Sequence, residues 1–340
     1  MSGPSPTQRS LTRDDVAWYV RASLGPGRDV VDCGPLGGGG FATVWWVTLD
    51  DGGAAVLKVA PPPGARLLRY ERGLAAAEAR YFRLVAAHAP QVPVPRVLHH
   101  GRDPERGEWL LTDRLPGRPL AELTADVDAG PARADFGAAT VALHRITGDR
   151  YGYDGGRAGG PTWSRAFAAI VDDLLADAAD WDVAPPGGPR LIRELVRHHA
   201  GALDEVRRPA LLHFDGWDGN VLAAPDATGA YRMCGLVDGE RYLWGDPLLD
   251  LVSPLLFRRA EDEPDHPFLR GWRAAGGQPA AFDPGARVRL GLYRLHLYLL
   301  MIVEMPSRGM TPENAPDRSA LLAELLDREL ADLGRGRPRP

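Results

Sequence analysis

The chain has 340 residues, a length that favours two domains or one domain with two lobes. Its hydrophobic fraction of 44% and charged fraction of 25% are ordinary for a globular protein and exclude a disordered or collagen-like chain. A net charge of −5 excludes a global positive field for nucleic acid, and two cysteines are too few for a disulfide framework. Neither a secretory signal nor a membrane-spanning stretch is visible, so we expect a cytoplasmic protein without a membrane partner, as a monomer or a dimer.

The N-terminal third combines short β-type segments, glycine turns and two helical patterns. A helix is predicted first, over residues 11–23, and a longer one over residues 67–88. Runs rich in β-forming residues predict strands over residues 30–34, 41–49, 54–60, 97–100 and 108–114. Residues 115–119, which contain two prolines and a glycine, are expected to connect this part of the chain to the next.

The rest of the chain has a helical texture. Helices are predicted over residues 132–147, 163–181, 190–206, 247–259, 286–305 and 320–333. Residues 211–243 differ, because two short apolar runs flank a turn and indicate a hairpin that carries loops. The predicted fold class is α+β, with a small β-rich lobe over residues 1–115, a larger mainly helical lobe over 116–333 and a flexible tail over 334–340.

A single lysine, Lys58, stands among 40 basic residues, and the other 39 are arginines. A lysine kept in such a sequence is expected where a compact ammonium is required and a planar guanidinium does not serve. Lys58 follows a glycine turn, in which backbone amides can approach phosphate oxygens and an aromatic residue at the tip can cover them. A plain hairpin turn is the alternative for the glycines alone. Together with the lysine they predict a phosphate site formed by Gly37, Gly38, Gly39, Gly40, Phe41 and Lys58.

Two later segments carry residues that suit phosphoryl transfer. Asp215 precedes Asn220 by five residues, between an apolar run and a strand. In such a loop the carboxylate can accept the proton of an attacking hydroxyl, and the amide oxygen can help to hold Mg²⁺. Asp238 follows an apolar strand and precedes a glycine, which is a common way to present a magnesium ligand. These observations predict Asp215 as the catalytic base and Asn220 and Asp238 as metal ligands.

With these motifs the chain resembles the aminoglycoside phosphotransferase family, within the protein-kinase-like fold, over nearly its whole length. The catalytic-loop pattern His-x-Asp-x4-Asn of that family is present as His213, Asp215 and Asn220. Its magnesium-binding Asp matches Asp238, which Glu240 follows, and its Gly-Asp-Pro-x2-Asp-Leu pattern matches residues 245–251. The resemblance implies a bilobal kinase-like fold, ATP or possibly GTP as the phosphoryl donor, and Mg²⁺.

Further roles follow only from the resemblance. It implies a glutamate on the long helix that pairs with Lys58, for which Glu78 is the first choice and Glu71 the second. The backbone of residues 111–114, with Thr112 and Arg114, is the expected adenine contact. Supporting roles fall to His213, Glu240, Asp246 and Asp250, and the last two are expected to brace the catalytic loop.

The acceptor is less clearly specified. Eight positions separate Asp238 from Asp246, too few for the activation segment with which protein kinases bind peptides, so a small hydroxylated acceptor is favoured. The family pattern is broken by Ala42 in the glycine loop and by Trp217 and Asp218 beside the catalytic base. Candidate acceptor contacts are Trp217, Asp218, Glu261 and Asp262.

The expected function is a nucleotide- and Mg²⁺-dependent O-phosphotransferase that acts on a hydroxyl of a small molecule. The first choice is an antibiotic, aminoglycoside-like or containing a nucleoside or sugar, so that the enzyme gives resistance. The alternatives are a metabolite kinase of the same fold, of fructosamine, methylthioribose, choline or homoserine type, and a nucleotide-binding pseudoenzyme.

Overall fold

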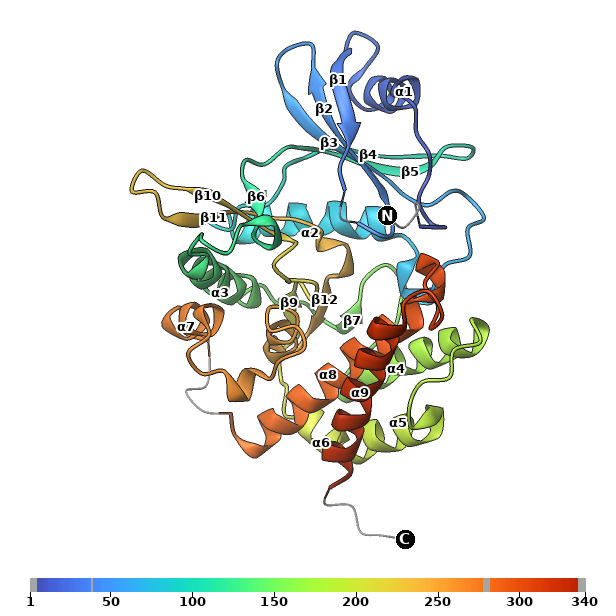
Figure 1. Ribbon diagram of the computed structural model, residues 1–340, viewed down its shortest axis with the longest axis vertical. Helices are drawn as coiled ribbons and strands as arrows, with labels where there is room; N and C mark the ends of the chain where they lie inside the picture. Colours follow the sequence, from blue (N-terminus) through green and yellow to red (C-terminus); the bar gives the residue numbers. More distant parts are fainter. Residues whose placement is uncertain (1–4, 38, 278–281, 336–340) are drawn as a thin grey trace. The chain divides into compact units, whose positions relative to one another are not determined.

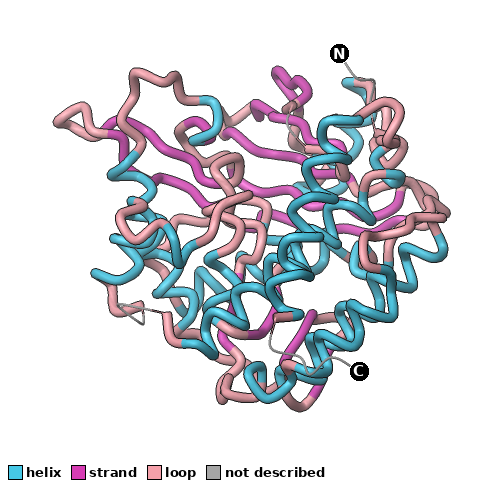
Figure 2. The backbone as a smooth tube through the Cα atoms, turned by 60° about the horizontal axis from the view of Figure 1, so that its bottom comes forward, coloured by secondary structure: helices cyan, strands magenta, loops and turns pink. Residues whose placement is uncertain are grey.

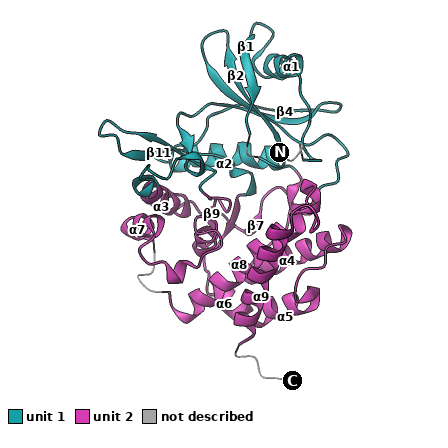
Figure 3. Ribbon diagram, in the orientation of Figure 1, with its two compact units in different colours: residues 1–67, 73–132, 218–241 teal, residues 68–72, 133–217, 242–340 magenta. Residues whose placement is uncertain are grey.

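A computed structural model describes residues 5–37, 39–277 and 282–335 of the chain (Figure 1). The described residues form two compact units, and neither unit is continuous in sequence (Figure 3). Unit 1 draws on residues 1–67, 73–132 and 218–241, and unit 2 on residues 68–72, 133–217 and 242–340. The division into lobes at residue 115 stays a prediction, since packing rather than chain order defines these units.

Unit 1 is built on a five-stranded antiparallel sheet with the order β1-β2-β3-β5-β4, whose strands run side by side in Figure 2. Its strands are β1 (Val30–Pro35), β2 (Thr43–Leu49), β3 (Ala54–Val59), β4 (Val97–Asp103) and β5 (Gly107–Asp113). Helix α1 (Arg13–Leu24) contributes Val16, Tyr19 and Val20 to a buried core shared with Leu57 and Leu111. The sheet thus packs against the apolar side chains of α1. Lys58 lies on β3, which is the central strand of the sheet.

The two helices of the N-terminal part begin where their local sequences allow. Helix α1 has Thr12 as its N-cap, and the capping box closes with Asp15. Helix α2 (Leu74–His88) starts later than predicted, because the 3₁₀ turn η1 (Arg69–Glu71) ends at the extended Arg72 and the N-cap Gly73 has a φ of 70°. The predicted helix over residues 67–88 is therefore wrong in its first two turns.

A second sheet of unit 1 contains the predicted hairpin. Strands β10 (Val221–Pro225) and β11 (Tyr231–Leu236) pair antiparallel, and the short strand β6 (Arg118–Pro119) lies at the other edge of β10. The hairpin turn is held by Asp226, whose side chain accepts from the backbone N–H of Thr228 at 2.8 Å. This sheet carries residues 220 and 238 at one end of the hairpin.

Unit 2 combines helices with a small four-stranded sheet of the order β8-β7-β12-β9. The sheet consists of β7 (Tyr151–Tyr153), β8 (Gly159–Gly160), β9 (Ala210–Leu212) and β12 (Leu243–Gly245). The helices are α3 (Gly130–His144, whose first three residues belong to unit 1), α4 (Trp163–Asp180), α5 (Gly188–His198), α6 (Ala200–Leu203), α7 (Pro267–Ala274), α8 (Pro284–Glu304) and α9 (Pro316–Gly334). Further 3₁₀ turns are η4 (Pro247–Leu251), η5 (Ala260–Asp262) and η6 (Pro306–Arg308) in unit 2, and η2 (Leu120–Glu122) and η3 (Gly239–Arg241) in unit 1.

Several predictions for this part need correction. The helix predicted over residues 247–259 is the 3₁₀ turn η4 followed by turns, because Pro254 lacks an N–H and cannot continue a helix. The strands β7, β8, β9 and β12 were not predicted, since segments of two or three residues show no periodicity. Helix α7, which spans eight residues, was not predicted either. Helix α9 includes Gly334, the first residue of the predicted tail, and residues 336–340 lie outside the described part.

The predicted α+β class is confirmed by these sheets and helices. Within the described part of the chain, every helix is too short or too polar to cross a bilayer.

Candidate active site

Lys58 lies in a cluster of three carboxylates within unit 1. Its Nζ donates to Glu78 Oε2 at 2.8 Å, to Glu240 Oε2 at 3.2 Å and to Asp238 Oδ1. The side chains of Glu78 and Glu240 are 3% and 7% exposed, whereas that of Asp238 is 34% exposed. The two glutamates are therefore shielded from solvent, and Asp238 is the carboxylate of the cluster that solvent can reach.

The electrostatics of the cluster follow from its burial and its unequal charges. Burial lowers the pKa of Lys58, but Asp238, Glu240 and Glu78 outweigh it and raise that pKa well above its usual value. Burial raises the pKa of Glu78 to about 8 although Lys58 opposes the shift, and burial also raises the pKa of Glu240. Three carboxylates converge on one ammonium, so the cluster offers oxygen donors for a further cation.

Glu78 reaches Lys58 because α2 packs against the turn η3 that follows Asp238. Gly239 has no side chain at the point of contact, and a Cβ there would lie 2.1 Å from Cδ1 of Tyr81, one helical turn from Glu78. Asp238 has a φ of 65°, a left-handed conformation that is uncommon for a residue with a side chain. Glu71, the second choice for the lysine partner, belongs to unit 2, where it accepts from Arg308 at 2.5 Å.

Asn220 and Asp238 lie at the same end of the β10–β11 hairpin. The N–H of Val237 donates to the carbonyl of Asn220 at 3.0 Å, one pair beyond Val221 and Leu236 in the strand register. The two predicted metal ligands are thus neighbours across the hairpin, and the side chain of Asn220 is largely buried. Their oxygens are the hard donors that Mg²⁺ prefers, so the donor set fits that ion.

The glycine loop precedes β2, and Gly38 lies outside the described residues. A Cβ at Gly37 or Gly39 would meet nothing within 4 Å, so both glycines face open space. Phe41 is buried and packs with Ala42 and Leu74, at the start of α2. Its ring therefore joins the loop to α2.

The segment expected to contact adenine is the end of β5. Thr112 is buried and Arg114 is exposed. The N–H groups of Asp113 and Arg114 donate to the carbonyls of Arg96 and Ala54, each at 3.0 Å. A base bound here would need other backbone groups of the segment.

In unit 2, Asp250 holds the backbone directly before Asp215. Its carboxylate accepts from the N–H of His213 at 3.1 Å and from the N–H of Phe214 at 2.7 Å, and His144 Nε2 lies 3.0 Å from it. Phe214 has a φ of 67°, and its carbonyl accepts from Ser253 Oγ at 2.5 Å. These contacts fix a strained backbone and so determine where the partly exposed Asp215 points.

We expect Asp250→Asn to destabilise the protein by about 2–4 kcal/mol, since an amide replaces one acceptor of a buried, fully used carboxylate. The misplaced loop should also lower kcat by about tenfold or more. Urea denaturation and initial rates below the unfolding range measure the two effects. Asp172→Asn is the control, because its carboxylate pairs with Arg193 on the surface and is 55% exposed. A variant as stable and active as the parent chain would refute the bracing role.

Asp246 occupies a separate buried network. Its carboxylate accepts from Arg289 Nε at 2.9 Å, from the Tyr293 hydroxyl at 2.7 Å and from the N–H of Leu248 at 3.1 Å. Burial raises the pKa of Asp246, while Tyr293 and Arg289 oppose the shift. The side chain fixes η4 against α8, so its contacts are those of a structural residue.

The candidate acceptor residues fall into two groups. Trp217 is 38% exposed, one of the few large apolar side chains with such exposure among the described residues, and Asp262 is also exposed. Asp218 is half-buried, and its carbonyl accepts from Ala121 N. Glu261 instead accepts from Arg294 through both oxygens, at 2.9 and 2.8 Å, and its side chain is 6% exposed. We therefore correct the interpretation of Glu261, because a carboxylate used up in a buried ion pair cannot attract a substrate.

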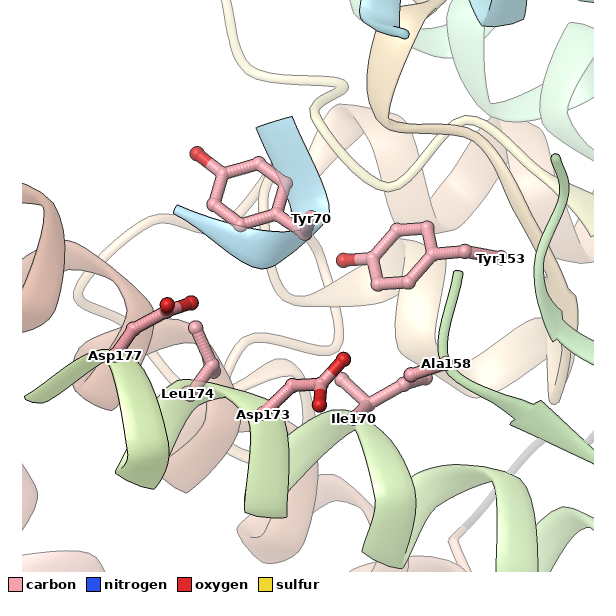
Figure 4. A pocket seen from close by; sticks show the side chains of 7 residues that line it. All are labelled: Tyr70, Tyr153, Ala158, Ile170, Asp173, Leu174 and Asp177. Carbon is pink, nitrogen blue, oxygen red and sulfur yellow. The ribbon is translucent and has the colours of Figure 1, made fainter. Parts of the chain in front are cut away.

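A small pocket of unit 2 lies between α4 and two tyrosine rings (Figure 4). Tyr70 and Tyr153 stack with their ring centres 6.3 Å apart, and Asp173 and Asp177 come from α4. Asp177 is committed to Arg69, whose backbone N–H it accepts at 2.9 Å. One of its two carboxylates is thus already used within the protein, and we give the pocket no role in the reaction.

Comparisons with known proteins agree with this geometry. The model of the Phosphotransferase enzyme family matches residues 32–286, which is more than half of the chain. No curated protein sequence matches.

Solved structures resemble the chain over almost its full length. A candidate fructosamine-3-kinase from Thermobifida fusca is 22% identical, with a TM-score of 0.66, over 94% of this chain and 100% of the other. A thermostable mutant of the aminoglycoside phosphotransferase APH(4)-Ia, in a ternary complex with AMP-PNP and hygromycin B, is 18% identical, with a TM-score of 0.58, over 95% and 99%. A complex of APH(2")-IIia with GDP and kanamycin is 13% identical, with a TM-score of 0.56, over 93% and 98%.

These structures share the fold, which confirms the kinase-like architecture expected from the motifs. The family match covers the glycine loop, Lys58, the catalytic loop and Asp238 in one alignment. The expectation of a phosphotransferase is thereby confirmed, and the chain belongs to the phosphotransferase enzyme family.

Proposed function

We propose that this phosphotransferase transfers the terminal phosphoryl group of a nucleoside triphosphate to a hydroxyl of a small molecule. The observation that carries the proposal is the buried ammonium of Lys58, held by Glu78 and set beside the more exposed Asp238. A fixed ammonium beside a carboxylate at a hairpin end is the arrangement by which kinase-like enzymes hold phosphates and a metal ion.

The residues of unit 1 serve the nucleotide in this proposal. Lys58 and the backbone of Gly37, Gly39 and Gly40 bind phosphate oxygens, and the end of β5 contacts the base. Gly38, also predicted for this role, lies outside the described residues. Asn220 and Asp238 would hold Mg²⁺, which supplies positive charge for the phosphates as their charge shifts during transfer.

Asp215 is the proposed catalytic base. It orients the acceptor hydroxyl and takes its proton as the oxygen forms a bond to the γ-phosphorus, while the bond from that phosphorus to the β–γ bridging oxygen breaks and the diphosphate leaves. Asn220 lies five positions after Asp215, and an extended chain of that length spans at most about 18 Å. Chain connectivity thus ties the base to the metal ligand.

For the acceptor we propose an antibiotic with a sugar or aminocyclitol hydroxyl. Support comes from the complexes with hygromycin B and kanamycin among the similar structures, and from the exposed indole of Trp217, which can stack on a sugar face. A sugar-amine metabolite is the alternative, in line with the similarity to a candidate fructosamine-3-kinase.

A phosphoryl-transfer screen tests the proposal. The protein is incubated with Mg²⁺ and either ATP or GTP against panels of antibiotics and of metabolites, and products are detected by a mass gain of one phosphoryl group. We expect a product that depends on Mg²⁺ and disappears with EDTA or in Asp215→Asn. Transfer to metabolites alone would favour the metabolite kinase, and nucleotide binding without transfer to either panel would favour a pseudoenzyme.

A further inference from the structure

A segment near the N-terminus, residues 5–9, runs along the glycine loop of unit 1, and we call it the N-terminal strap. Thr7 Oγ1 donates to the carbonyl of Gly40 at 3.0 Å. The side-chain amide of Gln8 donates to two carbonyls, that of Gly39 at 2.9 Å and that of Ala42 at 3.2 Å. One amide group therefore joins both limbs of the glycine turn.

The strap is held by a hydrogen bond within itself and by bonds from Arg9 to neighbouring segments. Gln8 Oε1 accepts from the N–H of Ser5 at 3.1 Å, which turns the NH₂ of Gln8 toward the loop. Arg9 and Thr43 exchange two hydrogen bonds at the start of β2, and the Arg9 guanidinium donates to the carbonyl of Arg106 at 2.5 Å. Thr7 is buried. These contacts hold the strap in one position against the glycine loop.

The hydrogen bonds also determine which way the loop amides point. In a trans peptide the C=O of one residue and the N–H of the next are antiparallel. Because the carbonyls of Gly39 and Gly40 face the strap, the N–H groups of Gly40 and Phe41 point away from it. A glycine turn without such contacts would sample many peptide orientations, since glycine restricts its backbone least.

We propose that Thr7 and Gln8 are positioning residues that orient the glycine-loop amides for the phosphates of the nucleotide. This inference rests on the proposed function, because it gives the strap a role in binding the nucleotide. The strap acts before any nucleotide binds, by lowering the conformational entropy that the loop must lose on binding.

Variants of the strap should therefore weaken nucleotide binding selectively. Gln8→Ala removes the two hydrogen bonds to the glycine loop together with the one from Ser5, and we expect the KM for nucleotide to rise about 3- to 10-fold. Gln8→Glu keeps the shape and the contact to Ser5 but places a carboxylate oxygen next to two carbonyl oxygens. The KM for nucleotide should therefore rise more than in Gln8→Ala. Thr7→Val keeps the buried shape without the hydroxyl, and Thr7→Ser, which restores a donor, should recover most of the loss.

Two measurements on the full chain test the inference. Hydrogen exchange without nucleotide reports the order of the amides of residues 39–43, and titration with AMP-PNP reports affinity. Gln91→Ala is the matched control, an exposed glutamine of unit 1 after α2. We expect faster exchange in the loop and weaker nucleotide binding for Gln8→Ala and Thr7→Val, with an unchanged KM for the acceptor and a kcat within about twofold.

Unchanged loop exchange in these variants would overturn the inference, and so would faster exchange with unchanged nucleotide affinity. A change in acceptor KM equal to that for nucleotide would reveal a general structural role and also contradict it. If the parent chain binds no nucleotide, the proposed function fails, whereas the exchange data still decide whether the strap orders the loop.

Discussion

Asp215→Asn is expected to lower kcat by about 10³-fold, while the affinity for nucleotide stays within about twofold. The amide cannot take the proton of the acceptor hydroxyl, but its size and its hydrogen-bonding oxygen remain. Since Lys58 and its carboxylates belong to unit 1 and Asp215 to unit 2, the phosphate contacts should not depend on this side chain. Steady-state rates and titration with AMP-PNP separate the two effects.

The control for this loss is Asp172→Asn, a 55% exposed aspartate of α4 whose carboxylate pairs with Arg193 on the surface. It carries the same chemical change at a position without a role in the reaction, and its kcat should be unaltered. Asp215→Ala extends the test by removing the hydrogen bond to the acceptor as well, so its acceptor KM should rise in addition. Turnover above about a tenth of the parental value in Asp215→Asn would refute the assignment of the base.

The family resemblance supplied Glu78 as the first choice for the partner of Lys58, whereas the contacts of Lys58 with Asp238 and Glu240 were not predicted. A helix repeats every 3.6 residues, and the spacing of Glu78 from Tyr81 and Leu84 favoured it over Glu71. Glu78 lies within α2, whereas Glu71 falls before the helix begins. The hairpin at residues 221–236 was equally visible, because β-type runs flank an Asp- and Gly-containing turn.

Contacts without a periodic signal could not be predicted. The bonds from Gln8 to the glycine loop join residues 31 and 34 positions apart, and they use backbone carbonyls that every residue possesses. Gly239 resembles any Asp-Gly turn in sequence, and only the position of Tyr81 shows why a side chain is excluded there. The ion pair of Glu261 with Arg294 was hidden for the same reason, since tertiary packing alone decides whether a carboxylate faces solvent.

Lys58→Arg should reduce kcat/KM for the nucleotide by about 10²-fold or more even though the charge is kept. Three carboxylates converge on one nitrogen, and the two glutamates among them are nearly fully buried. A guanidinium spreads its donors over a planar fork, which needs a wider site than a point ammonium. Tyr81 packs against Gly239 beside this cluster, so the turn after Asp238 leaves little room for the wider group.

The sequence itself makes this substitution informative. The other 39 basic residues are arginines, so the reverse exchange at an ordinary surface site, Arg21→Lys in α1, should leave kinetics and stability unchanged. Lys58→Met separates charge from shape, because it leaves the carboxylates without their cation and should cost more stability than the arginine variant. If Lys58→Arg retains more than about a tenth of the parental kcat/KM, the ammonium has no special function. The survival of one lysine in this chain would then be chance, and the nucleotide site would lose its main support.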